Sequence, residues 1–561
     1  MYIKKLIITT KDGMVVRDIV FHKGLNIIYG EVIQNTSSNN VGKTTLIKSI
    51  DFCLGGKIDN FYKDSETKNK DSLIFDFFQK QEPKFQLTLE NLDYEIVITR
   101  EISRGKKENT FEIKNTINCN GSDFDEEINI ALNKLLFDSS FKNPSFRNLI
   151  SNFIRKDNNG IEHVLKFLYS QASVDIYSVV HLFLFGFNDK KLLNDWFIAK
   201  SDFKKIYEKI NLLYDKIELK KLKELQENIE VIDSELEQEL NEFKKSFLLE
   251  FNDNGEIEDL RRQYIDYSEQ IEKIKANLYI KNKRLEKARK AYFNDDYGLE
   301  LELLYAEAKE NIGNFNMDFN RLVAFHNKML SSEIKYIEKS IEKENQELEN
   351  LVKNIDVITS KYNLKINEVF RDGVKEDLNL ALDKVLDKHK EQTLASEKLK
   401  NIQDLSKKEE EFNNFNNILL DSLGDVEKAL GEINLTFSEV TKNIIEKEST
   451  ISIDSSKDIK FTIDKSSANS GSGRKQCITL LYGLAYLQYL VNNNIRSPYF
   501  FVCDKIELID IKELEEIFKL SKDMNAQLII PIIKDKFDAL KDNYKDYIIL
   551  SLDEKNKFFR I

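Results

Sequence analysis

Apolar residues in the middle of the chain follow the 3-4 spacing of coiled-coil helices. The first seam comprises Ile257, Leu260, Tyr264, Tyr267, Ile271, Ile274, Leu278, Leu285, Ala288 and Tyr292, with Lys281 as its one polar member. The second comprises Ile334, Ile337, Ile341, Leu348, Leu351, Ile355, Ile358, Tyr362 and Val369, interrupted by Glu344 and Lys365. Each seam spans 36 residues, roughly 54 Å of helix. Equal lengths on either side of a short middle predict an antiparallel pair in which position i faces about 626 minus i.

Turn-forming clusters predict a bend in this hairpin. Residues 252–255 interrupt the outgoing helix, and the pairing rule places their partner near residues 371–373, which also favour a turn. Two such clusters opposite each other predict an elbow. The turnaround between the seams contains no cysteine, which excludes a zinc-bound tip.

Outside the hairpin, short apolar runs alternate with helical spacing, which predicts an α/β fold. Strands near 85–89, 94–98 and 110–113 are expected to form an antiparallel sheet. The expected domains are an N-lobe at 1–200, an outgoing arm at 201–292, a tip at 293–333, a returning arm at 334–424 and a C-lobe at 425–561. The two lobes form one bipartite head, and the long antiparallel coiled-coil hairpin with its elbow connects one lobe to the other.

A phosphate-binding loop is predicted near the N-terminus. The apolar strand at 24–30 is followed by a polar insert and then by Asn39, Asn40, Val41, Gly42, Lys43, Thr44 and Thr45. A phosphate loop needs free backbone N–H groups, a lysine for the phosphate oxygens and a hydroxyl for Mg²⁺. Ser37 stands where the usual first glycine would be, and Gly30 closes the strand instead. We interpret the segment as an ATP site; the alternative is a strand-to-helix turn that binds nothing.

Two segments near the C-terminus are expected to complete this site. Ser470, Gly471, Ser472 and Gly473 precede an apolar helix at 478–490, and a small loop at a helix N-terminus is an anion site by its geometry. The alternative for this loop is a flexible linker. The buried-strand pattern at 499–504 ends in Asp504, which we expect to hold Mg²⁺ together with Thr44.

Composition narrows the setting in which the chain works. Charged residues make up 32% of the sequence and prolines number four, which favours long helices. The net charge of −12 means that nucleic-acid contact requires a local basic patch. The four cysteines form no C-x-x-C pair, the N-terminus has no signal-peptide pattern, and the apolar run at 176–187 is too short to cross a bilayer. We expect a cytoplasmic protein without membrane contact.

The order of strand, phosphate loop, long antiparallel coiled coil, Ser/Gly loop and acidic strand resembles the SMC-like branch of ABC ATPases. Residues 21–28 through 51–56, 145–155 and 325–330 resemble, more narrowly, a bacterial family of uncharacterised SMC-like proteins. The resemblance extends to the ATPase subunits of Lamassu-type and three-component ABC antiphage systems.

This resemblance implies an ABC-type head that works as a homodimer. Two heads would enclose ATP and Mg²⁺, with Lys43 and Thr44 of one facing the signature loop 470–473 of the other. It also implies a clamp that engages double-stranded DNA or DNA ends and controls an effector nuclease, with an accessory subunit, in antiphage defence or DNA repair.

The chain departs from that pattern where hydrolysis is catalysed. Hydrolysing ABC enzymes carry glutamate after the acidic strand, whereas this chain has Lys505; Glu507 is the nearest substitute and Asp510 is the candidate D-loop acid. After the strand at 527–533, residues 534–535 are lysine and aspartate where a histidine is expected. Two functions are therefore consistent with the sequence. One is a weak ATPase, and the other is a non-hydrolysing ATP-binding scaffold whose coiled coil holds partner proteins. A third alternative is a structural arm protein with a vestigial loop.

Overall fold

The computed structural model describes residues 1–31, 42–63, 69–91, 93–106, 110–124, 126–156, 158–169, 171–213, 222–248, 255–290, 319–369, 372–456, 458–464 and 471–560. The chain forms two compact units. The first, called the head below, comprises Met1–Ile198 and Asn414–Ile561, and the second, called the arm unit, comprises Ala199–Asn413. The sequence placed the corresponding boundaries near residues 200 and 425.

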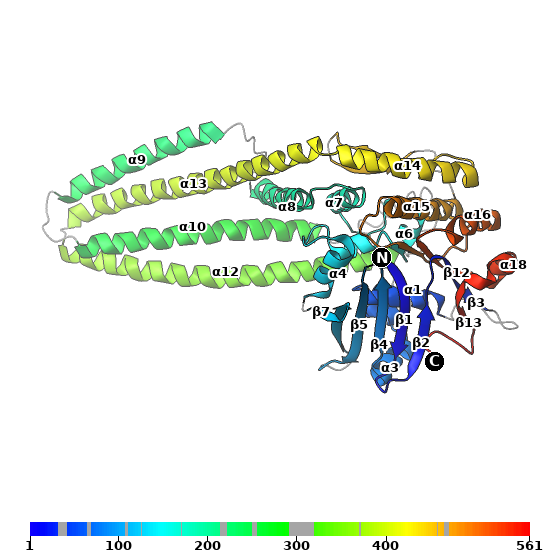
Figure 1. Cartoon of the computed structure of the whole chain (residues 1–561). Helices are drawn as coiled ribbons and strands as arrows, with labels where there is room; N and C mark the ends of the chain where they lie inside the picture. The colour runs from blue at the N-terminus through cyan, green and yellow to red at the C-terminus, as the bar shows by residue number, and fades with distance from the viewer. Residues whose placement is uncertain are drawn as a thin grey trace. The chain divides into compact units, whose positions relative to one another are not determined.

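A six-stranded antiparallel sheet occupies one side of the head (Figure 1). Its strands, in the order β2-β1-β4-β5-β6-β7, are Val15–Val20, Tyr2–Thr9, Lys84–Glu90, Glu95–Arg104, Phe111–Cys119 and Ser122–Phe124. Buried and half-buried residues alternate along β4 and most of β5, as expected for strands with one face on a core. The three strands predicted for this sheet are confirmed and are longer than predicted, whereas β1 and β2 were not anticipated.

The second sheet of the head combines strands from both ends of the chain. It is parallel, and its order is β13-β3-β12-β11-β8. These strands are Ile548–Leu552, Gly24–Gly30, Gln527–Ile533, Phe500–Cys503 and Ile154–Arg155. Every residue of β3 and β11 is buried, which accounts for their continuous apolar sequences. Because β3 pairs with β12 along its whole length, the N- and C-terminal parts of the chain share one core.

Helices and a small hairpin complete the head. The main helices are α1 (Lys43–Cys53), α3 (Ser72–Gln81), α4 (Ile128–Phe137), α7 (Val174–Leu184), α14 (Gly424–Ile445), α15 (Ser472–Asn492) and α16 (Ile511–Lys522). Short helices are α2 (Asp59–Tyr62), α5 (Phe146–Ile150), α6 (Asn158–Glu162), α17 (Lys534–Asp538) and α18 (Lys541–Tyr544). Strands β9 (Ile451–Asp454) and β10 (Lys460–Ile463) pair antiparallel. Helix α15 is buried on nearly all sides, which explains why its sequence is apolar without a clear polar face.

The arm unit is helical in its described part. Helix α8 (Lys190–Leu213) begins in the head, and α9 (Leu222–Leu248), α10 (Gly255–Lys290), α12 (Phe319–Val369) and α13 (Asp372–Asp421) follow. Helices α10 and α12 run antiparallel and share an apolar core of Ile271, Ile274, Leu278 and Leu351.

Polar members of the two seams pair with each other across this core. The Lys281 ammonium lies 2.7 Å from a Glu344 carboxylate oxygen and also donates to the Ser340 hydroxyl. Arg289 pairs with Glu338 at 2.8 Å. The 626-minus-i rule places residue 281 opposite 345 and residue 289 opposite 337, so both ion pairs lie within one residue of it.

Two features of the arms differ from expectation. Helix α12 begins at Phe319, well before the predicted start of the returning arm at 334, because apolar spacing continues upstream through Leu322 and Leu330. The returning arm is divided slightly before Gly373, because α12 ends at Val369 and α13 begins at Asp372, which places Gly373 in the first turn of α13. The other residues proposed for the elbow, apart from Gly255 and Asp372 at the starts of α10 and α13, lie outside the described residues.

Candidate nucleotide-binding site

The carboxyl ends of the parallel strands form one edge of the second sheet. Strand β3 ends at Gly30, and β11 ends at Cys503 just before Asp504. Both strands run parallel to β12, which lies between them, so their ends lie at the same edge. Ligands of open parallel sheets bind at this edge.

Gly42 begins helix α1 in a conformation that favours glycine. Its φ is 97°, in the left-handed region, and a Cβ at this position would lie 2.6 Å from the Cβ of Phe558. The Gly42 carbonyl accepts a hydrogen bond from the Thr45 N–H at 3.0 Å. Conformation and space together therefore exclude a side chain here. Asn39, Asn40 and Val41 lie outside the described residues.

Lys43 is a buried cation whose ammonium group has no hydrogen-bond partner among the described residues. Its side chain lies over Gly30, where a Cβ would come within 2.9 Å of the Lys43 Cδ. The side chain is buried, and no described residue accepts a hydrogen bond from Nζ. Burial lowers the pKa of Lys43, and the carboxylates of Glu507 and Asp504 oppose that effect. An anion placed at Nζ would supply the missing partner and stabilise the charge.

Asp504 and Thr44 form a hydrogen bond at the same edge of the sheet as Lys43. The Thr44 hydroxyl donates to Asp504 Oδ1 at 3.3 Å, and the Lys505 N–H donates to the same oxygen at 3.1 Å. Asp504 is 2% exposed, and no described residue donates to its Oδ2. Burial raises the pKa of Asp504; the Thr44 hydrogen bond and Lys505 oppose the rise, and Glu507 adds to it. A hydroxyl and a carboxylate with a free oxygen form a donor set that fits Mg²⁺.

Glu507 is the acidic side chain in the turn after Asp504. It is half-buried, and its charge acts on both Lys43 and Asp504. Lys505 is exposed and has a φ of 58°, so the chain turns sharply directly after Asp504. The turn thereby brings the carboxylate of Glu507 close to the charged groups of the site.

Asp510 and the segment 534–535 belong to the starts of two helices. The Asp510 carboxylate caps α16 by accepting from the Lys512 N–H at 2.9 Å. Lys534 and Asp535 begin α17 directly after β12. The sequence did not single out Lys536, whose ammonium donates to the Ile509 carbonyl and interacts with the Asp510, Glu507 and Glu513 carboxylates.

The Ser/Gly loop lies at the start of α15. Gly471 is the N-cap residue, Ser472 begins the helix, and none of the described side chains is seen to cap its first turn. Its terminal N–H groups thus leave a positive end available to an anion. A Cβ on Gly473 would lie 2.2 Å from the Leu508 carbonyl oxygen, so α15 packs tightly on the turn that follows Asp504. Ser470 lies outside the described residues.

Asp51 and Arg155 make contacts that hold the elements of the site in place. The Asp51 carboxylate pairs with Arg147 at 2.6 Å and Lys156 at 2.5 Å. The Arg155 guanidinium is buried and donates to the carbonyls of Asn152, Gly160, His163 and Val164 and to the Asn152 side chain. The Arg155 carbonyl in turn accepts from the Asp504 N–H at 2.9 Å. Sequence patterns do not predict the Asp51 pairs because Arg147 and Lys156 are distant from Asp51 in the chain.

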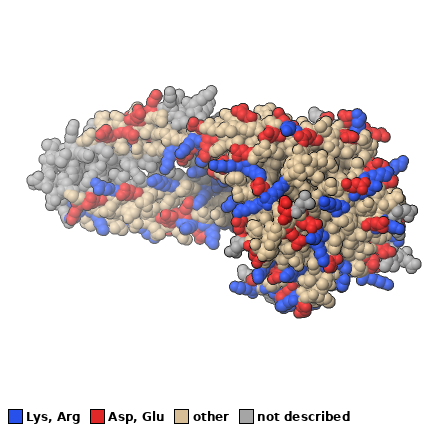
Figure 2. Space-filling model, viewed as in Figure 1, with Lys and Arg blue, Asp and Glu red and all other residues tan. Residues whose placement is uncertain are grey.

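Positive and negative side chains are interspersed on the face of the head in Figure 2. Among the described residues, no helix is long and apolar enough to cross a membrane. That part of the chain also contains no cluster of three or more histidine, cysteine or acidic side chains that could hold a metal ion.

Comparison with known proteins gives one family match. Residues 440–561 match the model of a family described as "Uncharacterised protein conserved in bacteria (DUF2326)". This segment runs from the end of α14 through α15, β11 and β12, and so contains Asp504 and the described Ser/Gly loop residues. No curated protein matches the chain.

Two solved structures are weakly similar to the chain. One is the Smc head domain with a coiled coil and joint derived from Pyrococcus yayanosii, at 16% identity, with 96% of this chain and 93% of that chain covered and a TM-score of 0.32. The other is the recombination mediator protein RecF with ATP, at 12% identity, with 95% and 92% covered and a TM-score of 0.28. Likeness at these TM-scores establishes neither the fold nor the function of this chain.

Proposed function

We propose that the chain is an SMC-like ABC ATPase that binds ATP with Mg²⁺ at the edge of its parallel sheet. The observation that carries the proposal is the buried ammonium of Lys43, which lacks a hydrogen-bond partner in the described part of the chain, beside the Thr44–Asp504 pair. The lysine supplies a phosphate partner, and the hydroxyl and carboxylate supply metal ligands. When bound, Mg²⁺ would neutralise phosphate charge.

Two heads are proposed to close on ATP as a homodimer. In this arrangement Lys43 and Thr44 of one head face residues 470–473 of the other. The uncapped start of α15 supports this role because it offers N–H groups and a positive helix end to the γ-phosphate. ATP then drives closure because it binds the closed state more tightly than the open one.

We further propose that this closure controls a partner effector, such as a nuclease with an accessory subunit, on double-stranded DNA or DNA ends. Antiphage defence and DNA repair are the two settings that the sequence resemblance favours. The paired seams of α10 and α12 form a two-helix coiled coil, a structure suited to contact with DNA or a partner.

Replacing Lys43 tests nucleotide binding directly. Lys43→Ala is expected to weaken ATP binding by about 100-fold, or about 2.7 kcal/mol, in isothermal titration with Mg²⁺. Lys57→Ala removes an exposed lysine downstream of α1 and should leave the affinity unchanged. Equal ATP affinities for wild type and Lys43→Ala would overturn the proposal.

A second candidate function is a non-hydrolysing scaffold in which ATP is structural and the arms hold partners. The observation that favours it is the exposed Lys505, which stands at the position where hydrolysing enzymes carry glutamate. Phosphate release should be measured for wild type and Glu507→Gln, with and without DNA. Turnover that Glu507→Gln reduces at least tenfold supports the ATPase, and no turnover by wild type under either condition supports the scaffold.

A further inference from the structure

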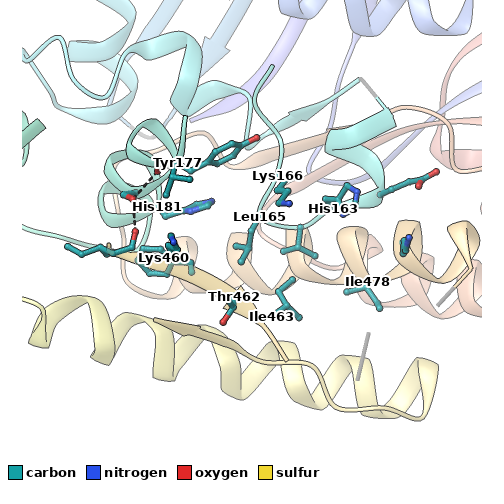
Figure 3. Close-up of a pocket in the computed structure, with 16 residues that line it drawn as sticks. His163, Leu165, Lys166, Tyr177, His181, Lys460, Thr462, Ile463 and Ile478 are labelled. Carbon is teal, nitrogen blue, oxygen red and sulfur yellow. Dashed lines mark hydrogen bonds between the residues drawn. The ribbon is translucent and has the colours of Figure 1, made fainter. Parts of the chain in front are cut away.

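The head contains a cavity of about 580 Å³ that is separate from the Lys43–Asp504 site (Figure 3). Four segments line it: residues 162–166, α7, the region of β10 and the first turns of α15. Its volume is typical of a small-molecule site. Figure 3 shows Leu165, His181 and Ile478 projecting around the same space.

The inner wall of this cavity is apolar. Val164, Leu165, Phe461 and Ile478 line it and are at most 9% exposed. The wall is held in place on one side by the Ser178 hydroxyl, which donates to the Ile459 carbonyl at 2.5 Å. A preformed apolar wall of this size favours a ligand with a hydrophobic body.

His181 contributes an aromatic ring to the wall. The residue is 4% exposed, and its Nε2 has no hydrogen-bond partner among the described residues. Burial lowers the pKa of His181 to about 3, so its imidazole is neutral. The ring stacks on Phe185, with ring centroids 5.8 Å apart. His181 thus presents an aromatic surface without a charge.

Three lysines add positive charge to the lining. Lys166, Lys460 and Lys475 line the cavity, and Glu162 is the one acidic residue that lines it in the described part of the chain. Burial lowers the pKa of His163, and the ammonium groups of Lys475 and Lys166 lower it further. The Lys460 ammonium lies 4.0 Å from the Asp458 carboxylate, so the three ammonium groups face two carboxylates, and the remaining positive charge favours an anionic group on the ligand.

We propose that this cavity binds a small amphipathic anion, with an apolar body of roughly ten carbon atoms and a carboxylate or phosphate head group. The body contacts Leu165, Phe461 and Ile478, and the head group pairs with Lys166 and Lys460. Lys475 and Ile478 belong to the first two turns of α15, so the ligand touches the helix that carries the Ser/Gly loop. The inference does not depend on ATP binding.

Calorimetric titration of the full chain without nucleotide tests this proposal. The probes are decanoate, decyl phosphate, decanol and decyltrimethylammonium, each below its micelle concentration. One molecule of decanoate or decyl phosphate should bind per chain, and the tighter of the two identifies the head group. Decanol should bind at least tenfold more weakly, and the cation should not bind. Equal affinities for all four probes would contradict the charge selection.

Two variants distinguish the contribution of the apolar wall to ligand binding from that of the lysines. Leu165→Trp fills the cavity and should abolish binding of both anions. The double change Lys166→Glu and Lys460→Glu alters exposed side chains and should weaken anion binding at least tenfold while leaving decanol unchanged. Lys57→Glu, elsewhere on the head, is the control for reversal of an exposed charge. Unchanged anion affinity in the Lys166/Lys460 variant overturns the proposal even if Leu165→Trp does not fold, and it leaves the ATP site untouched.

Discussion

Asp51 is the most strongly paired carboxylate described in the head. It is 3% exposed and binds two cations, Arg147 and Lys156. Burial alone would raise the pKa of Asp51, but the two cations outweigh it and the pKa is lowered. Because the carboxylate lies near the C-terminal end of α1, the pair of ion bridges fixes the helix that begins with Lys43.

Asp51→Asn is therefore expected to destabilise the head by about 2–3 kcal/mol, since it leaves two partly buried cations without a carboxylate. Urea unfolding followed by Trp196 fluorescence measures this, because Trp196 is the single tryptophan and is buried in the head. Asp18→Asn, which breaks the exposed Lys5–Asp18 pair, should cost no more than about 1 kcal/mol. Equal losses in the two variants would contradict the account.

The same ion pairs give the head a defined acid sensitivity. A carboxylate whose pKa is lowered by folding stabilises the fold above its unfolded pKa of about 3.9 and loses that contribution as pH falls. Wild type should lose stability below about pH 4 more steeply than Asp51→Asn. The free energy of unfolding should be measured by Trp196 fluorescence between pH 5 and 3. If it falls equally in the two proteins, the Asp51 ion pairs are not the cause of the acid sensitivity.

At the scale of single residues, the sequence predicted Lys43, Thr44 and Asp504 because each sits directly after a buried strand or at a helix start. It did not predict Phe558, which closes around Gly42, or Lys536, which faces Glu507. Their positions depend on how distant segments pack, and no local pattern marks them.

At the scale of elements, the ion pair between Lys281 and Glu344 sets the register of α10 against α12. Both side chains are partly buried, at 27% and 19% exposure, and both occupy seam positions. A polar pair inside an apolar seam favours one alignment, since any shift would leave a charge against apolar side chains.

Lys281→Met should lower the stability of the arm by about 1–3 kcal/mol because Glu344 loses its partner. Replacing both residues with leucine should recover that loss. Urea unfolding followed by far-UV circular dichroism measures the helices, and Lys283→Met, at an exposed ion pair, serves as the control with almost no change. A double variant as unstable as Lys281→Met would contradict this role.

The strands and helices of the head were predictable where their apolar runs were unbroken, as in β3, β11 and β12. The order of the parallel sheet was not, because local sequence does not specify that β12 lies between β3 and β11. Strands β1 and β2 escaped prediction because their charged residues come in adjacent pairs, so that the strict alternation that marks a half-buried strand is missing.

At the scale of the whole molecule, the account requires two chains for each complete ATP site. The start of α15 is available for this because Gly471 is exposed and a Cβ there would meet nothing within 4 Å. Gly473 is not a useful position to alter, because a side chain there would strike Leu508 within the same head. Gly471→Asp thus places a negative charge at the proposed contact with the γ-phosphate without disturbing the fold.

ATP-dependent pairing of the full chain, measured by sedimentation velocity with Mg²⁺ and ATP, tests the central claim most directly. Wild type should shift from one chain to two on addition of ATP. Gly471→Asp should still bind ATP but stay a single chain, and Gly431→Asp, at an exposed site that is also open, should pair like wild type. ATP binding without any change in mass, or undiminished pairing of Gly471→Asp, would contradict the account.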